Sequence, residues 1–153
     1  MQAEEKDIKF MREALKEAAS AAAMDEVPIG ALLVCGGEII ARARNERESA
    51  KCATRHAEVT AIEEGCRRLG GWRIPGATLY VTLEPCPMCA GAIVNARIDR
   101  VVFGAYDGKA GAFGSLLNLR DLPLNHRPEV RGGVLEEECR EILSEYFKSK
   151  RIK

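Results

Sequence analysis

The segment from Ala77 to Gly104 reads as strand, helix and strand, and this order restricts the possible folds more than any other feature. Ala77–Leu83 is rich in Thr, Tyr and Val, and Arg100–Gly104 is a second apolar run. Pro85 suits the start of the helix predicted over 86–97, because the first turn of a helix needs no donor from proline. A crossover of this kind pairs its two strands in parallel. The chain is therefore predicted to form an α/β sheet.

The rest of the chain adds helices and strands on both sides of this unit. The Gly36-Gly37 turn predicts an antiparallel hairpin, and apolar residues at helical spacing predict a helix near each end. The further elements are helices over 4–24, 54–69 and 135–150, strands over 29–35, 38–44 and 129–134, a loop over 45–54, a glycine-rich stretch over 105–114 and a helical turn over 116–119. We expect one domain, residues 1–153, with a mixed five-stranded sheet between helices on both faces, in three α/β/α layers.

The charge balance narrows the functions open to the chain. Its 153 residues include 23 Lys and Arg and 23 Asp and Glu, so the formal net charge at pH 7 is zero. Binding of nucleic acid through bulk positive charge is excluded, and any such contact needs a local basic patch. No apolar run approaches the roughly 20 residues that span a bilayer, and the charged N-terminus lacks an apolar signal core. We expect a cytoplasmic protein without membrane association, whose six cysteines are not a disulfide framework.

Two of the cysteines, Cys86 and Cys89, are three residues apart at a predicted helix start. At this spacing both sulfur atoms lie on one face of the helix, and the partial positive charge of the helix N-terminus favours thiolates. The pair suits a tetrahedral zinc ion, and it equally suits a thioredoxin-like redox centre. The Cys-x-x-Cys spacing alone does not decide between these two chemistries.

His56 and Glu58 favour the zinc site over the redox centre. They lie near the start of the helix predicted from Thr54, and residues two apart point to different sides of a helix. Both can act on one metal-bound water only if the ion lies beyond the helix end. We therefore predict two helix N-termini that converge on one ion. His56 joins the two cysteines as a third ligand, water takes the fourth position, and Glu58 is the nearby base. We interpret Glu84, next to the cysteine motif, as structural.

These residues carry a family resemblance. His56-Ala57-Glu58 followed by Pro85-Cys86-Pro87-Met88-Cys89 resembles the signature of the zinc-dependent cytidine deaminase superfamily. The similarity to bacterial tRNA-specific adenosine deaminases extends further, over Val27–Ala31, Thr78–Glu84, Val101–Leu117, Asn125–Arg127, Gly133–Leu135 and Tyr146–Lys148. It covers the chain from about residue 10 to residue 150.

The resemblance implies both the fold and the reaction. The fold is the three-layer cytidine-deaminase-like one, and the reaction converts the wobble adenosine of a tRNA anticodon to inosine. One Zn²⁺ per subunit is held by His56, Cys86 and Cys89. Zinc-bound hydroxide attacks C6 of the adenine ring, and Glu58 serves as the proton shuttle.

The resemblance also implies partners. The substrate is the anticodon stem-loop of a tRNA, the protein is a homodimer, and no nucleotide cofactor is needed. Asn45 and Asp107 match substrate-binding residues of the family. The possible RNA contacts are Arg55, Lys109, Phe147, Lys148 and Arg151, and the basic tail as a whole runs to Lys153. Many members have Asp-Pro-Thr-Ala before the histidine, where this chain has Cys-Ala-Thr-Arg over 52–55.

Two other functions are compatible with the same ligands. One is a zinc-dependent deaminase of a free nucleobase or nucleoside, such as guanine or cytosine, which needs neither Asp107 nor the basic tail. The other is a zinc-stabilised binding module without chemistry, in which Glu58 has no catalytic role. Basic residues at a helix C-terminus also stabilise the helix dipole, so the tail by itself does not require RNA.

Overall fold

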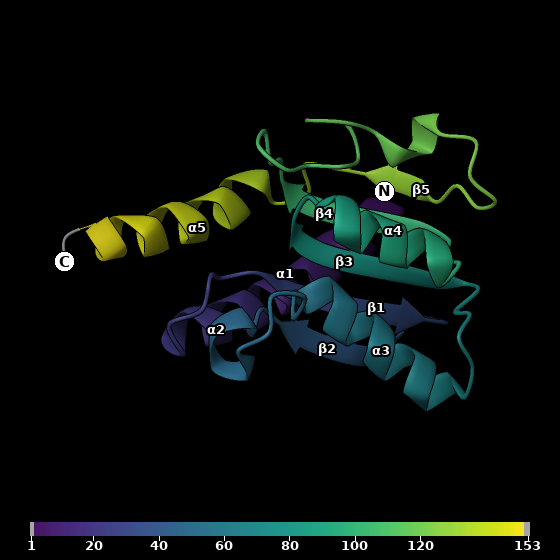
Figure 1. The fold of residues 1–153 in the computed structure, drawn as a ribbon, viewed down its shortest axis with the longest axis horizontal. Helices are drawn as coiled ribbons and strands as arrows, with labels where there is room; N and C mark the ends of the chain where they lie inside the picture. The colour runs from purple at the N-terminus through teal and green to yellow at the C-terminus, as the bar shows by residue number, and fades with distance from the viewer. Residues whose placement is uncertain (1, 152–153) are drawn as a thin grey trace.

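The computed structural model describes residues 2–151 (Figure 1). Five strands form one mixed sheet in the order β2-β1-β3-β4-β5. β3 (Ala77–Leu83), α4 (Pro87–Asn95) and β4 (Arg100–Ala105) form the predicted crossover, with β3 and β4 parallel. β1 (Gly30–Cys35) and β2 (Glu38–Arg44) form the predicted antiparallel hairpin. The hairpin joins the crossover through β1 and β3, which are antiparallel to each other.

Helices cover both faces of this sheet, as predicted. α1 (Gln2–Ala23) and the first part of α5 (Glu136–Arg151) lie on one face, and α3 (Ala57–Leu69) and α4 lie on the other (Figure 1). The strands contribute side chains to the core on both faces of the sheet, because successive side chains point to opposite faces. In β3, Leu79 belongs to the core under α3 and α4, whereas Tyr80 belongs to the core under α1. None of the described helices is long and apolar enough to cross a membrane.

Several element boundaries differ from the prediction. α3 begins at Ala57, so His56 and not Thr54 is its N-cap residue. The expected loop over 45–54 contains a short helix, α2 (Arg47–Ala50), and the last strand, β5 (Glu129–Arg131), is half as long as expected. The helical turn η1 (Leu119–Asp121) lies slightly later than predicted. Such differences fall at element ends, where long-range contacts compete with local preference.

α5 extends beyond the sheet. Its first turns contact β3 and β4, and Cys139 is its buried residue. The remaining turns project past the end of α1, so the carboxyl end of the helix lies at one extremity of the molecule (Figure 1). The predicted tail is thus presented on an extended helix, although Lys153 lies outside the described residues.

Candidate active site

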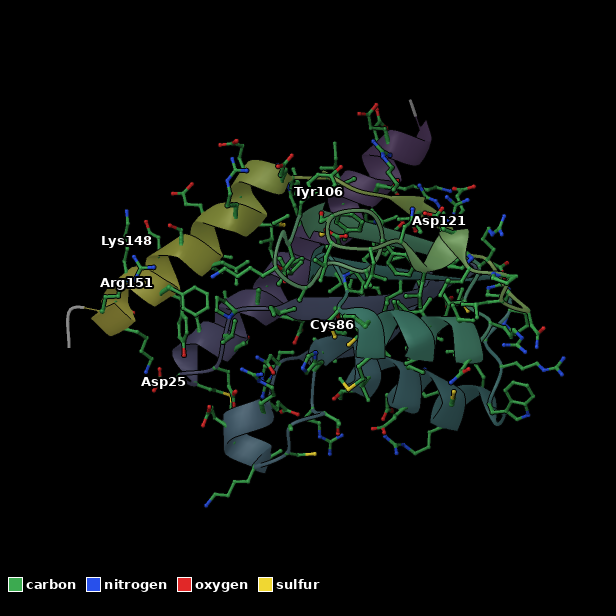
Figure 2. The ribbon with its side chains drawn as sticks, turned by 45° about the horizontal axis from the view of Figure 1, so that its top comes forward. Asp25, Cys86, Tyr106, Asp121, Lys148 and Arg151 are labelled. Atoms are coloured by element: carbon green, nitrogen blue, oxygen red, sulfur yellow. The ribbon has the colours of Figure 1, made fainter. Side chains whose placement is uncertain are left out.

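Two helix N-termini meet above the sheet, as the sequence predicts. α3 has His56 as its N-cap residue and α4 has Cys86, and both are in extended backbone conformations. Neither side chain makes a capping hydrogen bond within its own helix. Both are therefore available to each other and to a ligand between the helix ends. Figure 2 shows Cys86 near the centre of the molecule, at the start of α4.

Three donor atoms converge at this point. The sulfur atoms of Cys86 and Cys89 are 3.7 and 3.5 Å from Nδ1 of His56, and all three donors lie within 4.8 Å of one another. Tetrahedral zinc with its usual bond lengths holds sulfur and nitrogen ligands roughly 3.5 Å apart. The two sulfur–nitrogen distances therefore fit a metal ion of that size. His56, Cys86 and Cys89 are the three residues that the sequence predicts as ligands.

The charges of the group suit a cation. A hydrogen bond from the Cys89 thiol and the neighbouring His56 lower the pKa of the Cys86 thiol to about 4. The same hydrogen bond and burial raise the pKa of Cys89. The hydrogen bond with Cys86 raises the pKa of His56. Two cysteine sulfurs and one imidazole nitrogen are a donor set for a soft divalent metal.

Glu58 lies beside these donors in the first turn of α3. Its side chain is buried, with 4% of the residue exposed. Burial raises the pKa of its carboxyl to about 7, because the charged form loses its hydration. A buried carboxyl that exchanges a proton near neutral pH is a common feature of general acid–base sites.

A cavity of about 160 Å³ opens onto the cluster. Its wall includes His56, Glu58 and Cys86, together with Val27, Ile29, Asn45, Arg47, Ala57, Leu83, Glu84, Asp107 and Ala110. The structure thus brings Asn45 and Asp107 to one cavity with the predicted ligands His56 and Cys86. Pockets for drug-sized ligands have volumes of about 300 Å³ or more, so this cavity suits a single compact ring system.

Asn45 is held in the cavity wall by the backbone around it. It is 4% exposed, its Oδ1 accepts a hydrogen bond from the Arg47 amide at 3.3 Å, and its Nδ2 lies 3.5 Å from the Val27 carbonyl oxygen. Its own amide donates to the carbonyl of Ile29 at 3.0 Å. The side chain therefore has a defined position at the end of β2.

Sequence reasoning assigned no role to several residues of this wall, among them Val27, Ile29 and Arg47. Val27 and Ile29 flank Pro28, in a segment that forms part of the family resemblance. The proline indicates that regular structure is interrupted here, but it does not show that the residues beside it line a cavity. Arg47 had no sequence signal, because it falls in the segment expected to be a loop.

The predicted RNA contacts fall into two groups. Arg55 lies near the cavity, where its guanidinium donates to Glu63 at 3.2 Å, and Lys109 is exposed on the glycine-rich loop. Phe147, Lys148 and Arg151 are exposed on α5. Figure 2 shows Lys148 and Arg151 at the outer end of α5, well away from Cys86. A single ligand that touches both groups must be larger than a free base.

Comparison with known proteins gives the family. The model of the MafB19-like deaminase family matches residues 5–151. The chain is 57% identical over 145 residues to the tRNA-specific adenosine deaminase of Bacillus subtilis, with 94% of this chain and 90% of that protein aligned. It is 49% identical over 143 residues to that of Aquifex aeolicus, with 93% and 94% aligned. The chain belongs to the tRNA-specific adenosine deaminase family.

Solved structures agree with this membership. The deaminase superposes with a TM-score of 0.83 on a structure from studies of A-to-I editing by tRNA:A34 deaminases at the wobble position. That structure is 49% identical in sequence, and the match covers 88% of this chain and 99% of the other. A guanine deaminase from Nitrosomonas europaea, 22% identical, has the same fold with a TM-score of 0.75 over 89% of this chain and 81% of that one. The expected cytidine-deaminase-like fold is confirmed.

Proposed function

We propose that this chain hydrolyses adenosine to inosine at the wobble position of a tRNA anticodon. The observation that carries the proposal is the His56, Cys86 and Cys89 donor group at the wall of a cavity that Glu58 also lines, in a chain 57% identical to a tRNA-specific adenosine deaminase. The net reaction adds water at C6 of the adenine ring and releases the amino group as ammonia.

We propose one zinc ion per subunit, held by His56, Cys86 and Cys89. One imidazole nitrogen and two thiol sulfurs at tetrahedral spacing are typical zinc ligands, and they leave one position of the ion open. When bound, the ion supplies Lewis-acid activation of the water that hydrolysis consumes.

Glu58 moves the protons of the reaction. Its carboxylate takes a proton from the attacking water and delivers it to N1 of the ring. After the bond from oxygen to C6 forms, Glu58 carries the second proton of that water to the departing amino group. The bond from C6 to nitrogen then breaks, and ammonia leaves. Burial of Glu58 beside the donor atoms keeps bulk water away from these transfers.

Asn45 and the cavity select the base. A volume of about 160 Å³ accepts a base that has left the anticodon stack, and the buried amide of Asn45 can hydrogen-bond its edge. The ribose and the neighbouring nucleotides then lie at the mouth. There Asp107 and Lys109 contact the RNA, with Arg55 near a phosphate. Phe147, Lys148 and Arg151 contact the stem from α5.

We also propose that the active form is a homodimer. α3, α4 and residues next to them form a largely apolar groove, in which Trp72 is 60% exposed. It is lined by Val59, Ile62, Cys66, Trp72, Ala92 and Ala96, together with the polar Glu63 and Asn95. Pairing of two copies over this groove would bury the apolar surface. Sedimentation velocity is expected to give a dimer, and Ala92→Glu is expected to convert it to a monomer. A monomeric parent protein at micromolar concentration would rule out the dimer.

The proposed reaction is tested on a defined RNA. The zinc-loaded protein is incubated with an unmodified arginine tRNA transcript that has adenosine at the wobble position, and with free adenosine, guanine and cytosine in parallel. Nuclease digestion and mass spectrometry are expected to find inosine at that position alone. Ammonia release from a free base, without a tRNA product, would move the assignment to a nucleobase deaminase. No reaction with any of these would favour a zinc-stabilised binding module.

A further inference from the structure

Glu84 connects the cysteine motif to the glycine-rich loop. It follows β3 and precedes Pro85 and Cys86 in sequence, and it is 2% exposed. We infer that Glu84 is a positioning residue, whose carboxylate holds the loop over 107–115 in place as one wall of the substrate cavity. This inference rests on the proposed function, because it assigns the loop to that substrate.

The Glu84 carboxylate accepts four hydrogen bonds, all from this loop. Oε1 accepts from the Asp107 amide at 3.0 Å and from the hydroxyl of Ser115. Oε2 accepts from the amides of Phe113 and Ser115, both at 3.1 Å. A carboxylate offers about four acceptor positions, so each oxygen of Glu84 is fully used by protein donors. This arrangement leaves Glu84 as a structural anchor and not as a second proton shuttle.

The loop encloses the carboxylate closely. A Cβ atom built on Gly111 would lie 2.3 Å from the carboxyl carbon of Glu84 and 2.4 Å from its Oε1. Only glycine therefore allows the backbone to approach the anchor at this position. The Gly111 amide donates to the Asp107 carbonyl at 2.8 Å, which closes the loop on itself.

Asp107 is the residue that this anchor places. Its amide is bound by Glu84, and its own Oδ1 accepts hydrogen bonds from the amides of Lys109 and Ala110, at 3.0 and 3.2 Å. Asp107 and Ala110 both line the cavity. Loss of the bond from Asp107 to Glu84 would therefore loosen the cavity wall that faces the RNA.

The loop is also tied to the metal-ligand turn. The Ala112 amide donates to the Pro85 carbonyl at 2.8 Å, one residue before Cys86. The Glu84 amide donates to the Ala105 carbonyl at the end of β4, at 2.9 Å. The segment from Glu84 to Cys86 thus positions both a metal-ligand sulfur and the loop. A base and its neighbouring nucleotides are therefore held in a constant position relative to the reacting centre.

Glu84→Gln tests the inference, with Ser115→Ala as the matched control. The amide group of glutamine can donate to the Ser115 hydroxyl, but it leaves the Asp107 amide without an acceptor. Ser115→Ala removes the hydroxyl contact and keeps all three backbone bonds. We expect Glu84→Gln to raise KM for the anticodon stem-loop roughly ten-fold, with kcat and zinc content within about threefold of the parent. Ser115→Ala is expected to change KM less than threefold.

Amide hydrogen exchange gives a readout that does not depend on catalysis. In Glu84→Gln, the amide of Asp107 is expected to exchange at least ten times faster than in the parent protein, whereas the amides of β3 keep their rates. Gly111→Ala displaces the carboxylate without removing it, so it is expected to raise KM in the same way. This variant provides the test if Glu84→Gln does not fold.

Three results would overturn the inference. The first is an unchanged KM in both Glu84→Gln and Gly111→Ala. The second is a loss of kcat as large as in Glu58→Gln at constant KM, which would make Glu84 a proton shuttle. The third is unchanged exchange at Asp107. A parent protein that makes no inosine would instead defeat the proposed function, and the exchange data would still decide whether Glu84 holds the loop.

Discussion

The N-cap residues of α3 and α4 do not perform the usual task of that position. His56 and Cys86 begin the two helices, yet neither makes a capping hydrogen bond. A serine or aspartate at such a position commonly stabilises a helix by about 1 kcal/mol. Here the side chains point to a shared point between the helices. The helix predicted from Thr54 begins instead at Ala57, with His56 as its N-cap residue.

Glu58→Gln is the direct test of the proton shuttle. Glutamine fills the same buried space but cannot accept and return a proton, so kcat is expected to fall by about 10²- to 10⁴-fold. Zinc content and affinity for the stem-loop RNA are expected to stay unchanged, because Glu58 is not one of the three converging donors. Single-turnover kinetics and metal analysis provide the measurement. Deamination at the parent rate would remove Glu58 from the mechanism.

At the scale of elements, α1 packs tightly on β1 at Gly30. A Cβ atom on Gly30 would lie 2.1 Å from the carbonyl oxygen of Ala14 and 2.6 Å from the amide nitrogen of Ala18. Glycine thus lets the helix lie directly on the strand. The contact places the segment from Val27 to Ile29, which follows α1 and forms part of the cavity wall.

Gly30→Ala is expected to lower the free energy of unfolding by about 2–3 kcal/mol, because α1 must move away from β1. Gly71→Ala is the control, since a Cβ at Gly71 meets nothing within 4 Å, and it is expected to change stability by less than about 0.5 kcal/mol. Urea denaturation followed by circular dichroism measures both. Equal stabilities for the two variants would show that α1 adjusts without cost.

α5 is a second element whose position has a consequence for function. Lys150 forms an ion pair with Asp25 at 2.5 Å, and the Tyr146 hydroxyl donates to the Asp25 carbonyl at 3.2 Å. These contacts hold the far part of the helix against the end of α1 (Figure 2). They give the exposed Lys148 and Arg151 a constant direction relative to the site.

The double charge reversal Lys148→Glu and Arg151→Glu tests whether α5 contacts RNA. Loss of two phosphate contacts is expected to raise KM for tRNA, and to make the dependence of log affinity on log salt shallower by about 1.5. Lys16→Glu, a charge reversal on α1, is expected to leave the slope as in the parent. Filter binding at several salt concentrations gives the slopes. An unchanged slope in the double variant would exclude α5 from the RNA interface.

For the whole molecule, a buried carboxylate joins the first helix to three strands. Asp7 of α1 is 1% exposed and accepts hydrogen bonds from Tyr80 of β3 at 2.8 Å, from Arg100 of β4 at 2.8 and 2.7 Å, and from Arg131 of β5 at 2.7 Å. Burial alone would raise the pKa of Asp7, but the hydrogen bonds from Arg100, Tyr80 and Arg131 outweigh it and lower the pKa below 3.8. The cluster thus stabilises the sheet edge formed by β4 and β5.

Asp7→Asn is expected to destabilise the protein by about 3 kcal/mol at pH 7, because it leaves two arginines without their buried partner. The folded pKa is lower than the unfolded one, so this stabilisation is complete above about pH 4 and is lost as the pH falls through the folded value. The difference between parent and variant is therefore expected to shrink towards pH 3. Urea denaturation at pH 7, 5 and 3 measures it. Glu129→Gln, at an exposed partner of Arg100, is expected to cost less than about 1 kcal/mol.

Features that depend on neighbours in sequence could be predicted before the structure was known. The crossover from β3 through α4 to β4 follows from apolar runs and a helix-starting proline, which act over a few residues. The convergence of His56 with Cys86 and Cys89 spans 30 and 33 residues, and it was predicted from the chemistry of two short motifs at helix starts and not from local structural preference. The family resemblance added Asn45 and Asp107, which the structure places in the same cavity.

Long-range packing determined the features of the fold and of the site that the sequence did not predict. The pairing of β1 with β3, the short α2 and the wall residues Val27, Ile29 and Arg47 join parts of the chain that no local pattern connects. The four hydrogen bonds of Glu84 span 23 to 31 residues, so the residues next to Glu84 in sequence do not predict them. Local preferences determine where helices and strands form. A buried polar group at a site needs hydrogen-bond partners, and these can be distant residues that come near only in the completed fold.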